Sequence, residues 1–124
     1  MVQKQLKRFT SIAEITFQDV WNVLDKWEKG EASTESIFAF AEDLYDLGPG
    51  WPDYPRNDQR SVLFAVLESL EMIYTQPTLP SDISALKEFL VVGKTHPLDA
   101  WALIDEYWAN TDWNSRLKSS GTSG

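Results

Sequence analysis

Gly-Pro-Gly-Trp-Pro-Asp-Tyr-Pro-Arg-Asn-Asp, residues 48–58, is the stretch that decides the predicted fold of this 124-residue chain. Its three prolines and two glycines exclude a helix or a central strand here, because proline lacks a backbone N–H and glycine loses much entropy when fixed. The stretch also carries two large rings, Trp51 and Tyr54, which a plain linker does not need. We interpret residues 48–58, called the corner segment below, as a structured corner of a helical domain where a partner makes contact.

On both sides of the corner segment, apolar residues recur at the period of an amphipathic helix. No alternating run of β-branched residues is long enough for a strand, and the connections between helical stripes are short. The sequence therefore predicts an all-α fold, a compact antiparallel bundle of four to five helices, with the very apolar helix after the corner segment near its centre. The predicted helix starts are Thr16, Ser33 or Thr34, Asn57 or Asp58, Ser81 and Pro97, and the predicted ends include Gly30, Gly48 and Gly93.

One domain is expected from this length, which is sufficient for a single core without a metal or a disulfide. Residues 16–113 are predicted to form a single helical-bundle domain, residues 1–15 an N-terminal arm or short helix, and residues 114–124 a flexible tail. The chain has no cysteine, and its basic start is not followed by the apolar run of a signal peptide. No stretch approaches the roughly 20 apolar residues of a membrane span, so we expect a cytoplasmic protein.

The negative charge of the chain is concentrated in its helical body. The formal net charge is −8, yet residues 31–113 alone hold fifteen acids and four bases. Nucleic acid and anionic membranes are disfavoured as partners, because both are bound through basic groups. A basic protein partner is favoured, since opposite fields speed association. The alternative is that the acidity only keeps the protein soluble.

The sequence offers no recognisable catalytic motif, so we predict a non-enzyme without cofactor or metal. His96, the one histidine, precedes a proline at a predicted helix start and is interpreted as a capping or loop residue. The pairs Glu42-Asp43 and Asp105-Glu106 are sequence neighbours, which point about 100° apart on a helix and therefore diverge. A hydrolase that uses carboxylates from separate helices stays open as a less favoured alternative.

Three aromatic residues lie in breaks or at an end of the predicted helices: Trp51, Tyr54 and Trp113. Tyr and Trp are favoured at interfaces because they provide much contact area at a small entropic cost. The alternative for the two corner rings is that the loop folds back and covers the end of the bundle. A further alternative is a self-associating protein, a monomer or weak homodimer that uses Trp51 and Trp113 in a two-fold interface.

Asp53-Tyr54-Pro55-Arg56-Asn57-Asp58, after an acidic helix, resembles the Tyr-Tyr-Pro segment and following acids of colicin-type nuclease immunity proteins. These are small acidic four-helix bacterial proteins that bind and silence a basic nuclease domain. The resemblance covers roughly residues 11–73; Asp53 replaces the first tyrosine, and residues 77–113 have no counterpart. It implies that Tyr54 anchors the complex and that Glu35, Glu42, Asp43 and Asp46 lie on the helix that sets specificity.

The sequence thus predicts a non-catalytic acidic binding protein, an immunity-type inhibitor that captures a basic protein such as a toxin nuclease. The acidic side chains would take the place of substrate phosphates, and the corner rings would form the desolvated centre. The candidate partner-binding residues are Glu35, Glu42, Asp43, Asp46, Trp51, Asp53, Tyr54 and Asp58.

Overall fold

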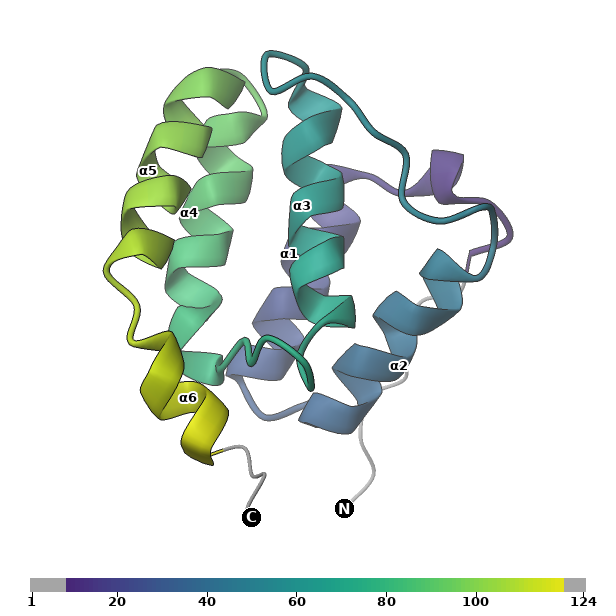
Figure 1. Ribbon diagram of the computed structural model, residues 1–124. Coiled ribbons are helices and arrows are strands. Elements are labelled where there is room, and N and C mark those ends of the chain that lie inside the picture. Colours follow the sequence, from purple (N-terminus) through teal and green to yellow (C-terminus); the bar gives the residue numbers. More distant parts are fainter. Residues whose placement is uncertain (1–8, 120–124) are drawn as a thin grey trace.

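Six α-helices and two short 3₁₀ turns are found in residues 9–119, the part of the chain that this computed structural model describes (Figure 1). No strand occurs within residues 9–119, so the predicted all-α fold is confirmed. The 3₁₀ turns are η1 (Ile12–Glu14) and η2 (Pro80–Asp82). The helices are α1 (Phe17–Glu28), α2 (Thr34–Tyr45), α3 (Gln59–Glu71), α4 (Ile83–Gly93), α5 (Pro97–Ala109) and α6 (Trp113–Ser119).

The two ends of the chain differ from the predicted layout. Residues 1–8 of the predicted arm lie outside the described residues, and the arm's last part forms η1. The α6 helix begins at Trp113 and occupies the start of the predicted tail, so the described part holds one helix more than expected. Trp113 and Arg116 attach α6 to the rest of the fold, as described below.

Helix caps explain most of the observed boundaries. Thr16 and Asp19 exchange hydrogen bonds in a capping box at the start of α1, and Gly30 follows its end with a φ of 75°, which favours glycine. Ser33 accepts a hydrogen bond from the Ser36 N–H at the start of α2, and Asp58 accepts one from the Arg60 N–H at the start of α3. These predicted starts and the end at Gly30 are confirmed.

The predicted cap at Ser81 is wrong. Pro80 starts the 3₁₀ turn η2, so the α-helix begins only at Ile83. The carboxylate of Asp82, the residue before the helix, makes no capping bond and instead accepts a hydrogen bond from the Leu79 N–H. This turn directs Asp82 into the interior, where it is 0% exposed.

The α3 helix occupies the centre of the fold, as predicted, and contacts α1, α2, α4 and α5. Gly93 of α4 allows this helix to lie close to α3, because a Cβ at this position would be 2.5 Å from Val62 Cγ1 of α3. Within the described part of the chain, no helix combines the length and apolar character needed to cross a bilayer. The buried residues of α3 are Ser61, Val62, Leu63, Phe64, Val66, Leu67 and Leu70.

Candidate functional site

Three predicted site residues lie on one helix, α2, and a fourth, Asp46, is its C-cap. Glu35, Glu42 and Asp46 follow one another at i, i+7 and i+11, which places them on one outer face, and Asp43 lies beside them. All four side chains belong to exposed residues, whereas the opposite face of α2 buries Ile37, Phe40, Ala41 and Leu44 in the core. We call Glu35, Glu42, Asp43 and Asp46 the α2 carboxylate row.

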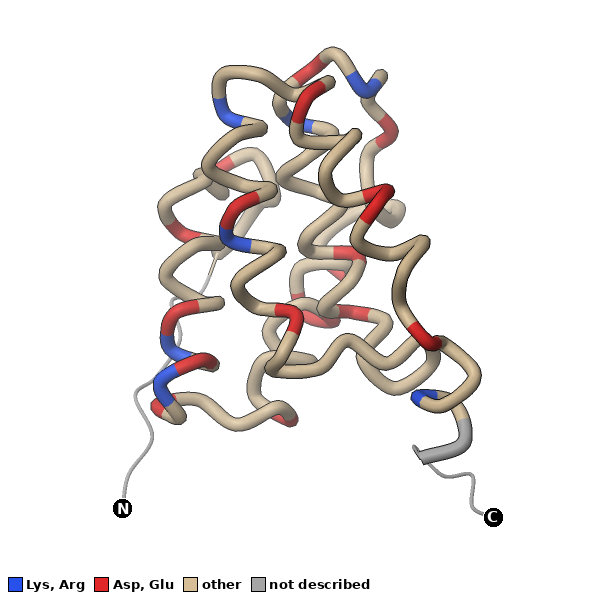
Figure 2. Tube along the Cα trace, turned by 90° about the vertical axis from the view of Figure 1, so that its left-hand side faces the viewer, with Lys and Arg blue, Asp and Glu red and all other residues tan. Residues whose placement is uncertain are grey.

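Position alone does not distinguish this row, since acidic residues recur along most of the traced chain (Figure 2). Their shared lack of a partner does. The chain has no Lys or Arg between Lys29 and Arg56. Among the described residues, none of the four carboxylates has an ion pair or a hydrogen bond. Elsewhere in that part some carboxylates have basic partners, namely Asp25, Glu28, Asp58, Asp82 and Asp105, whereas others have none, namely Asp53, Glu68, Glu71, Glu88, Asp99 and Glu106.

The corner segment packs its two rings against the bundle. Tyr54 stacks on Phe64 of α3 with ring centroids 5.9 Å apart, and Trp51 lies 6.2 Å from the same ring. Both residues are half-buried, and the Trp51 Nε1–H is buried without an acceptor among the described residues. Of the two interpretations of these rings, this packing corresponds to a loop that folds back over the end of the bundle.

The two acids of the corner segment have different surroundings. Asp53 is exposed, whereas Asp58 accepts hydrogen bonds from the backbone and the side chain of Arg60. These bonds, the side-chain one above all, hold the pKa of the Asp58 carboxyl below its ordinary value. The oxygens of Asp58 are therefore committed to the start of α3.

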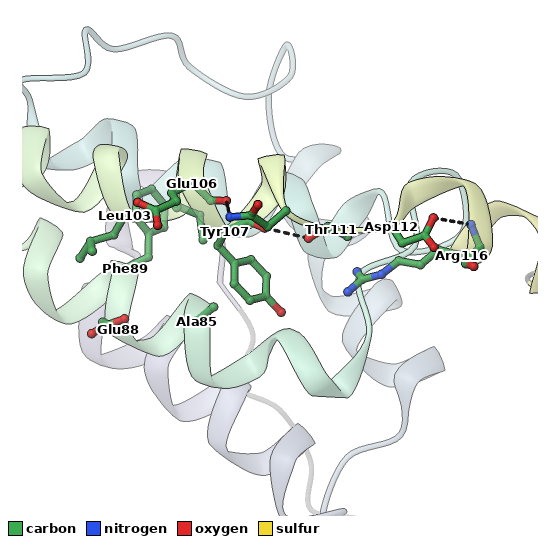
Figure 3. Close-up of a pocket in the computed structure, with 12 residues that line it drawn as sticks. Ala85, Glu88, Phe89, Leu103, Glu106, Tyr107, Thr111, Asp112 and Arg116 are labelled. Atoms are coloured by element: carbon green, nitrogen blue, oxygen red, sulfur yellow. Dashed lines mark hydrogen bonds between the residues drawn. The ribbon is translucent and has the colours of Figure 1, made fainter.

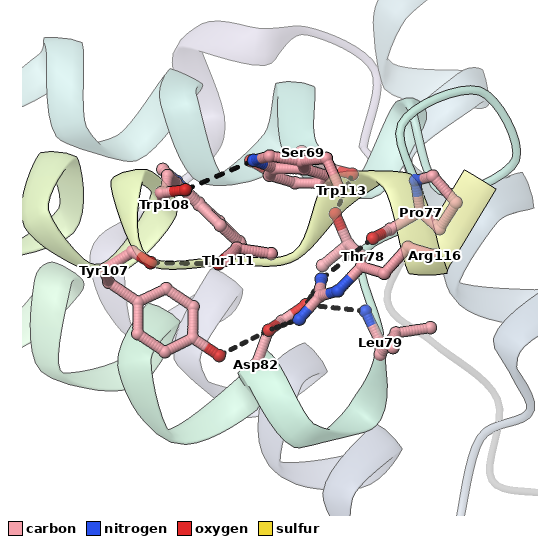
Figure 4. Close-up of polar contacts among 10 residues, drawn as sticks. All are labelled: Ser69, Pro77, Thr78, Leu79, Asp82, Tyr107, Trp108, Thr111, Trp113 and Arg116. Carbon is pink, nitrogen blue, oxygen red and sulfur yellow. Dashed lines mark hydrogen bonds and ion pairs between the residues drawn. The ribbon is translucent and has the colours of Figure 1, made fainter. Parts of the chain in front are cut away.

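A buried polar cluster that the sequence reasoning missed joins η2, α5 and α6 (Figure 4). The Asp82 carboxylate accepts two hydrogen bonds from the Arg116 guanidinium, at 2.6 and 2.8 Å, and others from the Tyr107 hydroxyl and the Leu79 N–H. Arg116 also donates to the Pro77 carbonyl. Every carboxylate oxygen thus has at least two donors, which is what a fully buried carboxylate requires.

Opposing effects set the pKa of Asp82. Burial alone would raise the pKa of this carboxyl, but the hydrogen bonds from Arg116, Tyr107 and the Leu79 N–H outweigh burial and lower it. Burial and the bond to Asp82 both raise the pKa of the Tyr107 hydroxyl. The cluster is therefore an ion pair inside the fold that fixes α6. Asp82 and Arg116 are 34 residues apart, and no local sequence pattern connects them.

An open groove of about 660 Å³ lies between α4, α5 and α6 (Figure 3). Its apolar lining includes Phe89 and Leu103, and Glu88 and Glu106 stand on the two helices that border it. The hydrolase alternative requires carboxyls from separate helices at one cleft, and these two come from separate helices. Both are exposed, so neither has the dry surroundings that usually tune a catalytic carboxyl.

Neither His96 nor any cluster of acids suggests a metal site. His96 is exposed at the start of α5, makes no side-chain cap, and shares a hydrogen bond of 2.8 Å with Thr95 Oγ1. Within residues 9–119, no three His, Cys, Asp or Glu side chains are grouped so that they could hold a metal ion.

No protein-family model, curated protein or solved structure matches this chain. The resemblance to immunity proteins therefore depends only on the residues quoted for it.

Proposed function

We propose that this chain is a non-catalytic acidic binding protein that captures a basic protein, as immunity-type inhibitors capture toxin nucleases. The α2 carboxylate row forms the centre of the binding surface. Asp53 and the exposed edges of the half-buried Trp51 and Tyr54 continue it onto the corner segment. The carboxylates occupy the place that substrate phosphates take on a basic nuclease.

The observation that carries the proposal is that four exposed carboxylates without a partner stand together along α2, and the position of three of them on the helix strengthens the argument. Glu42, Asp43 and Asp46 lie at the C-terminal end of α2, whose last turn has no basic residue. The helix dipole disfavours negative charge at this end by about 0.3–1 kcal/mol per group. These carboxylates therefore contribute nothing to α2 itself, and binding a basic surface gives them a role.

The test is capture of partners from the cell that makes the chain. Immobilised protein is compared with two triple variants that remove equal charge: Glu42→Gln/Asp43→Asn/Asp46→Asn on α2, and Glu88→Gln/Asp99→Asn/Glu106→Gln on α4 and α5. We expect basic proteins on the wild-type and control beads, released as salt rises from about 50 to 300 mM, and loss of capture by the α2 variant. Equal capture by both variants, or capture that salt does not change, would contradict the proposal.

Self-association is a second candidate, and one observation favours it. Val91 is 62% exposed beside a shallow groove of about 330 Å³ whose lining includes Phe17, Trp21 and Leu90, between α1 and α4. Trp113 is expected, with Trp51, to lie in such an interface. It instead packs on Trp108 and donates its indole N–H to the Trp108 carbonyl. Sedimentation of wild type and Val91→Asp tests this candidate: a monomer at micromolar concentration in both would exclude it.

A further inference from the structure

The α2 carboxylate row has aromatic residues along one edge. Phe38 and Tyr45 are seven residues apart and lie on the same edge of α2, and each follows a row carboxylate by three residues, Glu35 and Glu42 respectively. Tyr74, just after α3, packs edge-on against Phe38 with ring centroids 4.9 Å apart. Carboxylates and rings therefore alternate along one surface of the molecule.

Two of these rings are exposed to solvent, and each packs against another aromatic ring. Tyr74 is 55% exposed and has the half-buried Phe38 against it. Tyr45 is 40% exposed and lies edge-on to the half-buried Trp51, with centroids 5.5 Å apart. A supported tyrosine loses little conformational freedom when a partner covers it, which suits an interface anchor. Tyr54 differs, because Phe64 and the Arg60 guanidinium already lie against its ring.

Four cations of the described chain combine a carboxylate with an aromatic ring, and three of them are arginines. The fourth is Lys87, which pairs with Asp25 and Glu28 and lies 4.4 Å from the Trp21 ring centroid. Arg56 pairs with Asp105 and lies 4.1 Å from the Trp101 ring centroid. Arg60 combines Asp58 with Tyr54, and Arg116 combines Asp82 with Trp113. A guanidinium can bind a carboxylate with two parallel N–H bonds and stack on an aromatic face, which an ammonium cannot do.

The edge of α2 offers the same combination without an internal cation. Among the described residues, no Lys or Arg forms an ion pair with Glu42 or lies over the ring of Tyr45 or Tyr74. Building on the function proposed above, we infer that this surface selects an arginine-rich segment of a partner protein, with Tyr45 and Tyr74 as its aromatic anchors in place of Tyr54. The row supplies the charge, and the two tyrosines distinguish arginine from lysine.

The experiment uses hepta-arginine and hepta-lysine peptides as probes of equal charge, with affinities measured by fluorescence anisotropy at about 50 mM salt. We expect hepta-arginine to bind more tightly. Tyr74→Leu and Tyr45→Leu should each weaken hepta-arginine binding about 2- to 5-fold and change hepta-lysine binding less, whereas Tyr74→Phe, which keeps the ring, should retain it. Tyr54→Leu is the matched comparison and should weaken hepta-arginine binding less than Tyr74→Leu does, because Phe64 and Arg60 already lie against the Tyr54 ring.

Amide chemical shifts of the wild-type protein give a measurement independent of any variant, with hepta-arginine perturbing α2 and Tyr74 more than residues 51–54. Equal affinity for the two peptides, or a larger loss in Tyr54→Leu than in Tyr74→Leu, would overturn the inference. A further outcome is that Glu42→Gln/Asp46→Asn weakens the binding of both peptides more than Glu88→Gln/Glu106→Gln does. In that case the proposed function stands even if the preference for arginine is overturned. If both double variants bind like wild type, the proposed function fails as well.

Discussion

The Asp82 carboxylate and the α2 carboxylate row carry the same chemical group in opposite surroundings. Asp82 is fully buried, and Arg116, Tyr107 and the Leu79 N–H donate to it. The four row carboxylates are exposed, and none has a partner among the described residues. A buried charge must be satisfied within the fold, whereas an exposed one stays available to another molecule. The first should therefore govern stability, and the second should govern binding.

The largest effect is expected from Asp82→Ala, which leaves the Arg116 guanidinium half-buried without its carboxylate. Removing one partner of a buried ion pair costs about 3–5 kcal/mol, so this variant should lose most of the stability of a small domain. Urea unfolding followed by circular dichroism at pH 7 measures the change. Asp46→Ala, which removes a carboxylate from the row, is the control and should change stability by less than about 0.5 kcal/mol. Similar losses in both would remove the distinction between the two regions.

A smaller loss of stability is expected when the pH is lowered. The pKa of Asp82 is lower in the folded chain than the ordinary value of 3.8, so its contribution is fully present above that value. The contribution is lost as the pH falls below 3.8 through the folded pKa, because protonation is then linked to unfolding. The free energy of unfolding, measured from pH 6 to pH 2, should therefore fall as the pH is lowered. In Asp82→Asn this decrease of the unfolding free energy should be smaller, and an unchanged decrease would show that other carboxyls cause it.

The exposed region was the more predictable of the two from sequence. Glu35 and Glu42 belong to one helix and Asp46 is its C-cap, so their shared outer face follows from the local period of 3.6. The predicted end at Gly48 is wrong, because α2 already ends at Tyr45. The starts at Thr16, Ser33 and Asp58 were predictable for the same reason, because a cap contacts backbone two or three residues away.

The buried region was not predictable, because its contacts connect distant parts of the chain. Asp82 meets Tyr107 and Arg116 only after α4 and α5 have packed, and a sequence shows which residues are acidic without showing which become buried. The same limit explains the corner segment. Its lack of helix followed from proline and glycine, but the packing of Trp51 and Tyr54 on Phe64 depends on where α3 lies.

The smallest effect, and the one of opposite sign, is expected from neutralising the end of the α2 row. Glu42→Gln/Asp43→Asn/Asp46→Asn removes three negative charges from the helix end where the dipole disfavours them, and it also lessens repulsion within the row. We expect stability to rise by about 0.3–1 kcal/mol, read as a higher urea midpoint at low salt. Added salt should stabilise the wild type more than the variant, because screening relieves the same repulsion.

The Glu88→Gln/Asp99→Asn/Glu106→Gln variant separates this local effect from the general benefit of a lower net charge. A loss of stability in the α2 variant would mean that the row supports the fold, and its unpaired carboxylates would then cease to be an argument for a partner.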